Sequence, residues 1–377
     1  MTNEKLIHLY TCLDISTGGG RETYVSTLVS YGIPGVSKDV IKSLEGIDQS
    51  QLKLLHVQEE KALIDITGEC PSIFTAHNHD SYCPSGTKYF STSQQFCTRS
   101  ISVLGCTWGH LIDGCGSRRP KNIVHNISSS YRVLEKLKKL RIPVIANSDY
   151  VREQLIKNGL PAEQTVTLRY GIPTPKSVTE PLTLEIHQNQ RILFAGRIVP
   201  DKGLEWLIKA LAQTDVSIHL DIAGEGWDRP RMEKLVNQLG LNNRVTWHGW
   251  CNSERIDLLY QRCFAIIFPS VWPEPAGLIT LESYARYRPV IASKVGGIPE
   301  HLLDRETGIL VPVNDIKQLA AAITYLSTNY QKSRLLGQQG HAWFLKDFTM
   351  DVHINKLQQL YEKTINSFHG QKLLFSE

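Results

Sequence analysis

The sequence predicts an α/β protein made of two Rossmann-like domains, each with a parallel sheet covered by helices. Its 377 residues exceed what one ordinary hydrophobic core organises. Short apolar runs alternate along the chain with stretches of helical periodicity, which is typical of parallel sheets. The stretch 171–190 contains three prolines and no such periodicity, and it therefore indicates a linker between two sheets.

The expected strands fall into two groups, one on each side of this linker. The first group comprises 6–11, 54–58, 72–76, 143–146 and 166–168. The second group comprises 192–195, 218–223, 245–248, 265–268, 290–292 and 309–311. Amphipathic stretches that predict helices lie between them, for example at 204–211 and 232–239. We therefore expect a first domain over 1–172 and a second over 173–349, with a final helix at 353–361 in the remaining segment 350–377.

Composition and charge limit the classes of partner. The net charge of +4 suits an anionic small ligand or a weak encounter with an acidic membrane surface. It falls short of the basic density of a dedicated nucleic-acid binder. The first 13 residues contain no apolar stretch and cleavage site of the kind that marks a signal peptide. We therefore expect a cytoplasmic protein with reduced cysteines, with the inner face of the membrane as the alternative location.

Two cations follow the first strand of the second half. Gly196 allows a tight turn at the strand end, and Arg197 and Lys202 then stand before an expected helix. Helix N-termini favour anions, so two cations there would neutralise a diphosphate, Arg through a forked contact and Lys as a point charge. The alternative is a pair of solvated surface charges, and the strand–loop–helix context favours the diphosphate.

The next two strand ends carry weaker signals. The stretches 223–226 and 247–250 are rich in glycine and include Gly249. Turn chemistry explains such glycines more often than ligand contact does, because the third glycine of a dinucleotide fingerprint is missing.

Two carboxylates flank one expected helix start. Glu274 lies on a proline-rich turn, a helix begins near Leu278, and Glu282 stands about one turn inside it. Carboxylates accept hydrogen bonds from vicinal hydroxyls of a sugar or ribose. An acidic pair that stabilises the helix dipole is the alternative, and spacing alone does not decide between the two.

Five features follow one another along the second half: Gly196-Arg197, Lys202-Gly203, Glu274, Glu282 and the turn at 295–300. Their order resembles that in retaining GT-B glycosyltransferases of family 4. Their second domain carries a Gly-Arg-x4-Lys-Gly loop, an E-x7-E signature and a Gly-Gly-x-Pro-Glu turn. The matching motifs lie within 191–319. The resemblance implies that Arg197 and Lys202 hold the donor diphosphate, that Glu274 faces the donor sugar, and that Glu282 contacts the ribose. The amides of Ala276, Gly277, Leu278 and Ile279 would complete the phosphate cradle.

The resemblance also implies a fold and an activity. In the GT-B fold two Rossmann-like domains face each other across a cleft, and the C-terminal helix returns to the first domain. The expected reaction is transfer of a sugar from a nucleotide-diphosphate donor, UDP or GDP before ADP, to a saccharide or lipid-linked acceptor, with retention and without metal or cofactor (EC 2.4). A sugar-nucleotide-binding protein without transfer activity is the alternative. An NAD-type oxidoreductase is disfavoured, because no complete Gly-x-Gly-x-x-Gly follows an early strand.

In the first half, Gly19 and Gly20 resemble the family's Gly-Gly-x-Glu loop near the donor phosphates, and His77 resembles its active-site histidine. Read from the residues alone, His77, His79 and Asp80 could instead form part of a metal site, or His77 could be an ordinary core residue.

Four cysteines cluster downstream, at Cys83, Cys97, Cys106 and Cys115. Four thiols in a short stretch suggest tetrahedral zinc as one possibility. The gaps of 13, 8 and 8 residues lack the close pairing of strong zinc motifs. Buried free thiols are therefore the favoured interpretation.

The stretch 130–141 predicts a helix with one basic face. Such a face could touch anionic lipid, although a solvated face is commoner. Ser148 then precedes the next expected helix as a natural N-cap.

Overall fold

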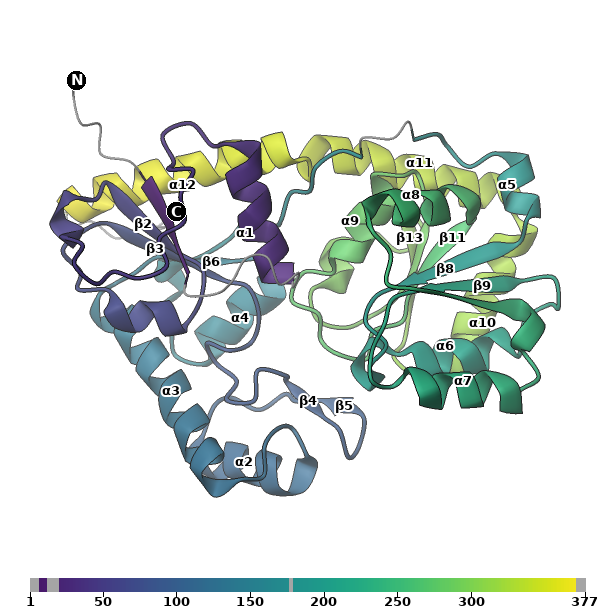
Figure 1. Cartoon of the computed structure of the whole chain (residues 1–377), viewed down its shortest axis with the longest axis horizontal. Coiled ribbons are helices and arrows are strands. Elements are labelled where there is room, and N and C mark those ends of the chain that lie inside the picture. Colours follow the sequence, from purple (N-terminus) through teal and green to yellow (C-terminus); the bar gives the residue numbers. More distant parts are fainter. Residues whose placement is uncertain (1–6, 12–19, 176–178, 371–377) are drawn as a thin grey trace. The chain divides into compact units, whose positions relative to one another are not determined.

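The computed structural model describes residues 7–11, 20–175 and 179–370 of the chain (Figure 1). The chain is divided into two compact units. The first unit comprises residues 1–93, 97–170 and 351–377, and the second comprises 94–96 and 171–350. Each unit contains one parallel sheet, so the predicted α/β class with two sheets is confirmed.

The first unit is built on a sheet with strand order β1-β2-β3-β6-β7. These strands are β1 (Ile7–Tyr10), β2 (Leu54–Val57), β3 (Ser72–Ala76), β6 (Val144–Ala146) and β7 (Thr165–Thr167). All five strands are parallel. Strands β2, β3 and β6 are buried along their whole length, which explains why their sequences are mostly apolar. Its longer helices are α1 (Gly20–Tyr31), α3 (Pro120–Lys139), α4 (Asp149–Lys157) and α12 (Met350–Gly370), with short turns η1 (Gln49–Gln51), η2 (Lys61–Asp65) and η4 (Ala162–Gln164). Ser148 caps α4 as predicted, its Oγ accepting from the Val151 amide at 3.1 Å.

Helix α12 packs on the first unit through buried polar pairs. His56 of β2 lies 2.7 Å from the Tyr361 hydroxyl on one side and 2.7 Å from the Thr75 hydroxyl on the other. Burial lowers the pKa of His56 to about 3, so the ring is neutral at pH 7. Helix α12 is therefore tied to the middle of the first sheet.

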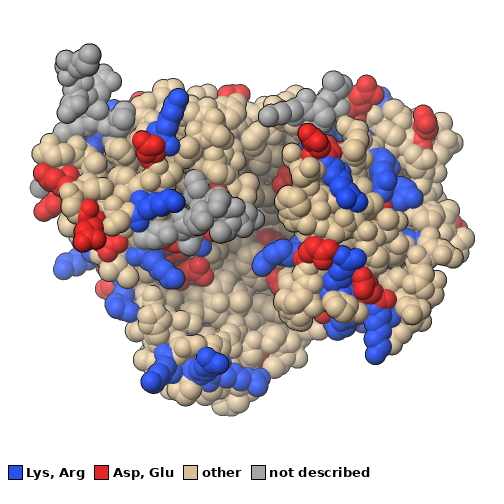
Figure 2. All heavy atoms as spheres, viewed as in Figure 1, with Lys and Arg blue, Asp and Glu red and all other residues tan. Residues whose placement is uncertain are grey.

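Between β3 and α3 lies a segment for which the sequence predicted no elements. It contains β4 (Tyr89–Phe90), β5 (Gln95–Phe96), α2 (Val103–Trp108) and the π-helical turn η3 (Gly109–Asp113). These elements are too short to produce a readable period. Lys and Arg side chains gather over the α2 end of the first unit (Figure 2).

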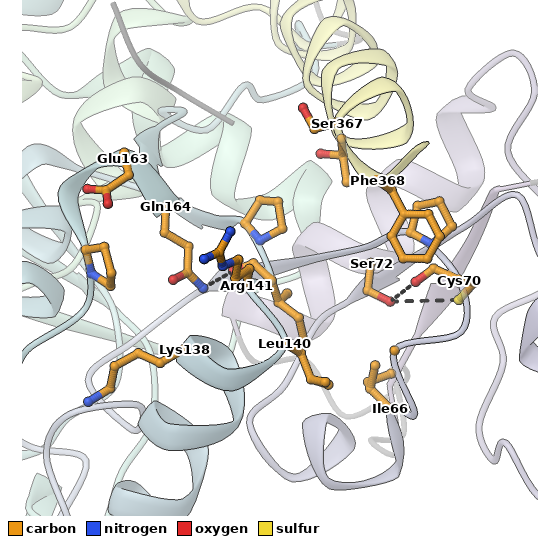
Figure 3. A pocket seen from close by; sticks show the side chains of 16 residues that line it. Ile66, Cys70, Ser72, Lys138, Leu140, Arg141, Glu163, Gln164, Ser367 and Phe368 are labelled. Atoms are coloured by element: carbon orange, nitrogen blue, oxygen red, sulfur yellow. Dashed lines mark hydrogen bonds between the residues drawn. The ribbon is translucent and has the colours of Figure 1, made fainter. Parts of the chain in front are cut away.

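A cavity of about 440 Å³ opens at the amino-terminal edge of the first sheet (Figure 3). Its lining includes Ser72, Pro143 and Gln164, at or next to the starts of β3, β6 and β7, and Phe368 of α12. Ligands of doubly wound sheets bind outside the carboxyl ends of the strands. This cavity therefore lies at the opposite edge from the predicted site.

The second unit is built on a six-stranded parallel sheet with order β10-β9-β8-β11-β12-β13. The strands are β8 (Arg191–Ala195), β9 (His219–Ala223), β10 (Val245–Gly249), β11 (Ala265–Phe268), β12 (Val290–Ser293) and β13 (Gly308–Val311). Its helices are α5 (Leu184–Gln188), α6 (Leu204–Leu211), α7 (Arg229–Gln238), α8 (Ser253–Arg262), α9 (Leu278–Tyr284), α10 (Ile316–Thr328) and α11 (Tyr330–Asp347), with turns η5 (Pro200–Lys202), η6 (Asn242–Arg244) and η7 (Ile298–Glu300). This is the Rossmann order, in which the chain reverses direction across the sheet between β8 and β11. That switch point is where a ligand is expected.

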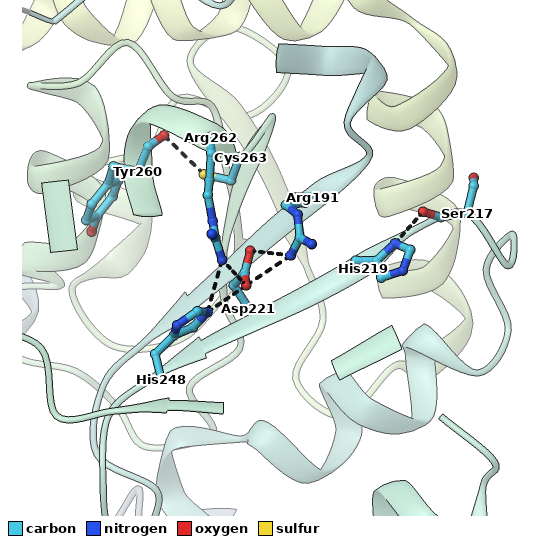
Figure 4. A network of polar contacts seen from close by, with 8 residues as sticks. All are labelled: Arg191, Ser217, His219, Asp221, His248, Tyr260, Arg262 and Cys263. Carbon is cyan, nitrogen blue, oxygen red and sulfur yellow. Dashed lines mark hydrogen bonds and ion pairs between the residues drawn. The ribbon is translucent and has the colours of Figure 1, made fainter. Parts of the chain in front are cut away.

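A buried carboxylate ties four elements of this unit together (Figure 4). Asp221 of β9 accepts from Arg191 at 3.1 Å, from Arg262 at 2.6 Å and from His248 at 2.7 Å. Burial by itself raises the pKa of Asp221, but the His248 hydrogen bond and the two guanidinium charges outweigh burial and leave this pKa below its ordinary value. The ion network therefore stabilises the packing of β8, β9, β10 and α8.

Asp221→Ala should lower the free energy of unfolding by about 3 kcal/mol at pH 7, because it leaves two partly buried cations without their carboxylate. Denaturant unfolding of wild type, Asp221→Ala and Asp221→Asn measures this. A depressed folded pKa contributes stability above the unfolded pKa, so the advantage over Asp221→Asn should shrink as the pH falls below about 4. Equal stability of all three proteins at pH 7 would contradict the assignment.

Candidate functional site

Two of the predicted site residues contact each other directly at the switch point. Lys202 Nζ lies 2.5 Å from Glu274 Oε1, and both side chains are largely buried. The ammonium group also lies over the Trp272 ring, 4.6 Å from its centroid. Ser270 Oγ donates to the same Glu274 oxygen at 2.9 Å. Ser270 and Trp272 were not predicted as site residues, because neither belongs to a recognised motif.

The loops that carry this ion pair are joined through backbone atoms. The Asp201 carbonyl accepts from the amides of Val271 and Trp272 at 2.9 and 3.1 Å. Trp206 Nε1 donates to the Pro269 carbonyl at 2.7 Å. Gly203 has φ +74°, and a Cβ there would lie 1.8 Å from the Pro269 oxygen. The loop after β8 and the loop after β11 are thus held as one piece, and only glycine fits at 203.

The Gly-Gly turn predicted from the resemblance supports Glu274 from the other side. The Gly297 amide donates to the Glu274 carbonyl at 2.7 Å. Gly296 has φ +59°, and a Cβ there would lie 2.5 Å from that carbonyl oxygen. The backbone of Glu274 is therefore fixed as well as its side chain.

The glycines at the ends of β8, β9 and β10 stack against one another. The Gly196 amide donates to the Ala223 carbonyl at 2.9 Å, and the Gly224 amide donates to the Gly249 carbonyl at 2.8 Å. A Cβ on Gly224 would lie 1.8 Å from the Gly196 oxygen. These glycines therefore have a packing role, whatever ligand contacts they also make.

The remaining donor-side residues lie on two chain segments. Arg197 is exposed, and its carbonyl accepts from the Val199 amide at 3.2 Å, whereas its guanidinium has no hydrogen bond or ion pair to another described residue. Gly277 has φ +65° and precedes α9, whose first turn contains Leu278 and Ile279. Ala276 is buried directly before it. The amides of a first helical turn have no partner within the helix, so those of α9 can receive an anion.

The side chain of Glu282, on α9, contacts a residue of helix α8. Its Oε2 accepts from the Tyr260 hydroxyl at 3.3 Å. Burial raises the pKa of Glu282 above its ordinary value, and Arg286 partly opposes this. No hydrogen bond joins Glu282 to Glu274 among the described residues.

In the first unit, His77 sits at the carboxyl end of β3 among side chains from neighbouring strand ends. Its Nε2 lies 2.9 Å from Gln58 Oε1, and its Nδ1 accepts a short hydrogen bond from the Tyr170 hydroxyl. Asn147 donates both to the His77 carbonyl and to the Tyr170 oxygen, at 2.9 and 3.2 Å. Burial holds the pKa of His77 well below its ordinary value, so the ring is neutral with the proton on Nε2.

Next to this cluster, a carboxyl group is buried beside the first turn of α1. Glu60 accepts from Ser81 Oγ at 2.8 Å and pairs with Arg21 at 3.5 Å. Burial, followed by the nearby Asp80 charge, raises the pKa of Glu60 to about 7. Gly20 begins α1, whereas Gly19 lies outside the described residues. Glu60 was not predicted as a site residue, because no sequence motif includes it.

The side chains named in the two metal interpretations do not form a ready-made set of metal ligands among the described residues. His79 Nδ1 lies 2.7 Å from the Tyr82 hydroxyl, and Asp80 accepts from Asn78 at 2.7 Å. Within the ranges described above, no three His, Cys, Asp or Glu side chains are arranged to hold a metal ion. The seven described cysteines are free thiols.

The sequence is similar to known glycosyltransferases. Residues 183–343 match the family described as Glycosyl transferases group 1. YqgM of Bacillus subtilis, an uncharacterized glycosyltransferase, is 28% identical over 271 residues, which cover 70% of this chain and 73% of YqgM. LpsE of Rhizobium meliloti, a lipopolysaccharide core biosynthesis glycosyltransferase, is 29% identical over 169 residues, 45% of this chain and 48% of LpsE. The chain thus aligns with about half the length of LpsE.

A solved structure supports the fold. Anabaena HepE in complex with UDP matches with a TM-score of 0.71 at 17% identity, over 95% of this chain and 99% of HepE. The chain therefore has the GT-B fold. The family match and the relatives support a transferase enzyme of the glycosyltransferase class (EC 2.4).

Glu60→Gln should remove a pH-dependent cost of folding. A carboxyl whose folded pKa is about 7 instead of 4.5 binds its proton more tightly in the folded state, so stability falls as the pH rises from about 4.5 to 7. The thermal midpoint of Glu60→Gln should therefore exceed that of wild type at pH 8 and match it near pH 4.5. A constant difference across this range would contradict a raised pKa. Glu45→Gln, at an exposed position, is the control.

Proposed function

We propose that this chain is a retaining glycosyltransferase that moves a sugar from a nucleotide-diphosphate donor to a saccharide or lipid-linked acceptor. The observation that carries this proposal is the Lys202–Glu274 pair, fixed at the switch point between β8 and β11. Exposed Arg197 stands at the end of the same β8 strand. A sugar-nucleotide-binding protein without transfer activity is not favoured, because the relatives are glycosyltransferases.

On the donor side, Lys202 and Arg197 are the cations that neutralise the diphosphate. Lys202 is already held by Glu274 and by the Trp272 ring, so its ammonium is positioned before the donor arrives. Both cations stabilise the negative charge that develops on the leaving oxygen, without a metal ion. The amides from Ala276 to Ile279 supply further donors, and Gly249 lets the chain approach the nucleoside.

Glu274 then positions the sugar. One of its oxygens accepts from Lys202 and Ser270, and carboxylates also accept from sugar hydroxyls. For Glu282 we propose the contact with the ribose that the resemblance implies. Retention is proposed from the same resemblance, with attack on the face that the diphosphate leaves and transfer of the acceptor proton to that diphosphate.

On the acceptor side, His77 acts as a neutral hydrogen-bonding group. Its Nε2 proton is directed at Gln58, and a substrate hydroxyl or carbonyl would take the place of that amide oxygen. A neutral ring cannot serve as a cation for the phosphates, so this task stays with Arg197 and Lys202.

The donor assignment is tested by thermal stability against UDP-, GDP- and ADP-sugars. UDP-sugars come first, because HepE, which shares the fold, was solved with UDP. At a hundredfold excess over Kd, a bound donor adds about 2.7 kcal/mol of stability and raises the midpoint. Lys202→Ala should abolish this shift and lower kcat/KM at least about a hundredfold.

Lys209→Ala is the matched control, because Lys209 is paired with Glu205 on α6. It should keep both the donor shift and the activity. A donor that stabilises the protein but is neither transferred nor hydrolysed would instead support a binding protein. No shift with any nucleotide sugar would overturn the proposed site.

An exposed apolar face in the first unit fits a lipid-linked acceptor. On α2 and η3, five large apolar side chains face solvent, with Leu104 86% and Trp108 57% exposed. The others are Val103, Leu111 and Ile112. Exposed Arg118, Arg119 and Lys121 follow in sequence. Apolar side chains beside basic ones are typical of contacts with anionic lipid. No described helix is long and apolar enough to cross a membrane.

The double variant Leu104→Asp/Trp108→Asp should bind anionic vesicles about a hundredfold more weakly, because each lost side chain contributes about 1.5 kcal/mol. Vesicle co-sedimentation at low and high salt measures this. Trp250→Asp, at an exposed tryptophan of the second unit, is the control. Unchanged binding of the double variant would contradict a membrane contact at α2.

A further inference from the structure

The four cysteines singled out in the sequence line one small cavity in the first unit. Cys83, Cys97, Cys106 and Cys115 come from a stretch in which they are separated by 13, 8 and 8 residues. They nevertheless border the same space of about 30 Å³, together with His110 of η3. The folding of β4, β5, α2 and η3 thus brings together thiols that sequence spacing alone did not pair.

His110, which lines the same cavity, has a buried ring nitrogen without a partner among the described residues. The residue is fully buried, and its Nδ1 lies 3.0 Å from the Ser117 carbonyl, which can only accept. Nδ1 therefore carries the proton, and Nε2 is left with a lone pair. Nε2 is buried and has no hydrogen-bond partner among the described residues. A histidine that donates one ring N–H to a backbone carbonyl and offers the other nitrogen is arranged as metal-ligating histidines are.

The backbone around the ring allows this placement. A Cβ on Gly116 would lie 2.6 Å from His110 Cε1, and a Cβ on Gly109 would lie 3.1 Å from Cys115 Sγ. Glycine at these two positions lets the chain close around the imidazole and the thiol.

One amide and one ammonium group of Lys88 lie at the cavity, where burial by itself raises the pKa of the Cys106 and Cys115 thiols. The Lys88 amide lies 3.4 Å from Cys83 Sγ and can donate to it. The Lys88 side chain is buried, and its ammonium donates to the Arg99 carbonyl at 2.6 Å. A buried positive charge costs stability unless negative charge lies near it, and no carboxylate forms an ion pair with Lys88 among the described residues.

We infer that this cavity is a structural site for a zinc-class divalent ion, bound by His110 Nε2 and thiolates of the cysteine cluster. Thiolate and imidazole ligands together suit tetrahedral zinc. Three thiols would each release a proton on binding, and three thiolates, a neutral imidazole and a divalent ion sum to one negative charge. The Lys88 ammonium offsets that charge.

The thiols are not yet at ligand spacing, since no three described donors already surround one point. Binding therefore requires the cysteine side chains that line the cavity to move closer to one another. The ion would cross-link the stretch 83–115, which has few buried apolar side chains of its own. This inference does not depend on the proposed transfer reaction.

The test is the zinc content of the full-length chain, expressed with zinc and purified without chelator. Elemental analysis should find about one zinc per chain. His110→Ala and Cys106→Ser should lower zinc affinity at least about tenfold. Cys251→Ser, which removes a partly exposed cysteine of the second unit, should retain the ion.

Cobalt substitution of the wild-type chain provides a second readout that needs no variant to fold. Bound Co²⁺ should show thiolate-to-metal charge-transfer absorption, which added zinc should abolish. Absence of both zinc and this absorption would overturn the inference. Full zinc content in His110→Ala, or equal loss in Cys251→Ser, would overturn it as well.

Discussion

The close approach of two backbone loops at the switch point of the second sheet governs the rest of the candidate site. Gly203 has no side chain that would collide with the Pro269 carbonyl, so the loop of Lys202 rests directly on the loop of Glu274. The Asp201 carbonyl then accepts two amides of the second loop. An ion pair between side chains on separate loops would otherwise cost considerable conformational entropy. Here the backbone contact has already restricted both partners, so the charges can be held in place for a ligand.

Several polar groups of the two units differ in their surroundings. In the second unit, Asp221 is surrounded by two arginines and a histidine, which lower its pKa, and Lys202 pairs with Glu274. In the first unit, burial suppresses charge, so that His56 and His77 are neutral and Glu60 holds its proton near pH 7. This division fits the proposed reaction. The diphosphate needs permanent cations, whereas an acceptor hydroxyl is positioned well by neutral hydrogen-bonding groups.

The segment between β3 and α3 is ordered mainly by polar contacts and not by the apolar burial that holds the rest of the first unit. Its helix α2 has no buried residue, and its strands are two residues long. Its order depends on Arg99 paired with Asp113, on Lys88 bound to a carbonyl, and on the cysteine cavity. A segment with so little apolar burial gains most from a cross-link. The same segment presents the exposed apolar face, so its internal order would also determine how that face meets a membrane.

The sequence by itself determined the fold class, the eleven strands of the two parallel sheets and the segments that meet at the switch point. Buried parallel strands produce continuous apolar runs, and tight backbone approaches require glycine, so both leave local signals such as Ile192–Gly196 and Lys202-Gly203. Only the tertiary structure decided which side chains share partners. His56 meets Tyr361 across 305 residues, and His110 joins cysteines that lack motif spacing. Asp221 meets Arg191 and His248 because β8, β9 and β10 are neighbours in the sheet, and it meets Arg262 because α8 packs nearby. Such contacts depend on strand order and register, which local periodicity does not encode, and this is why the polar networks became visible only in the folded chain.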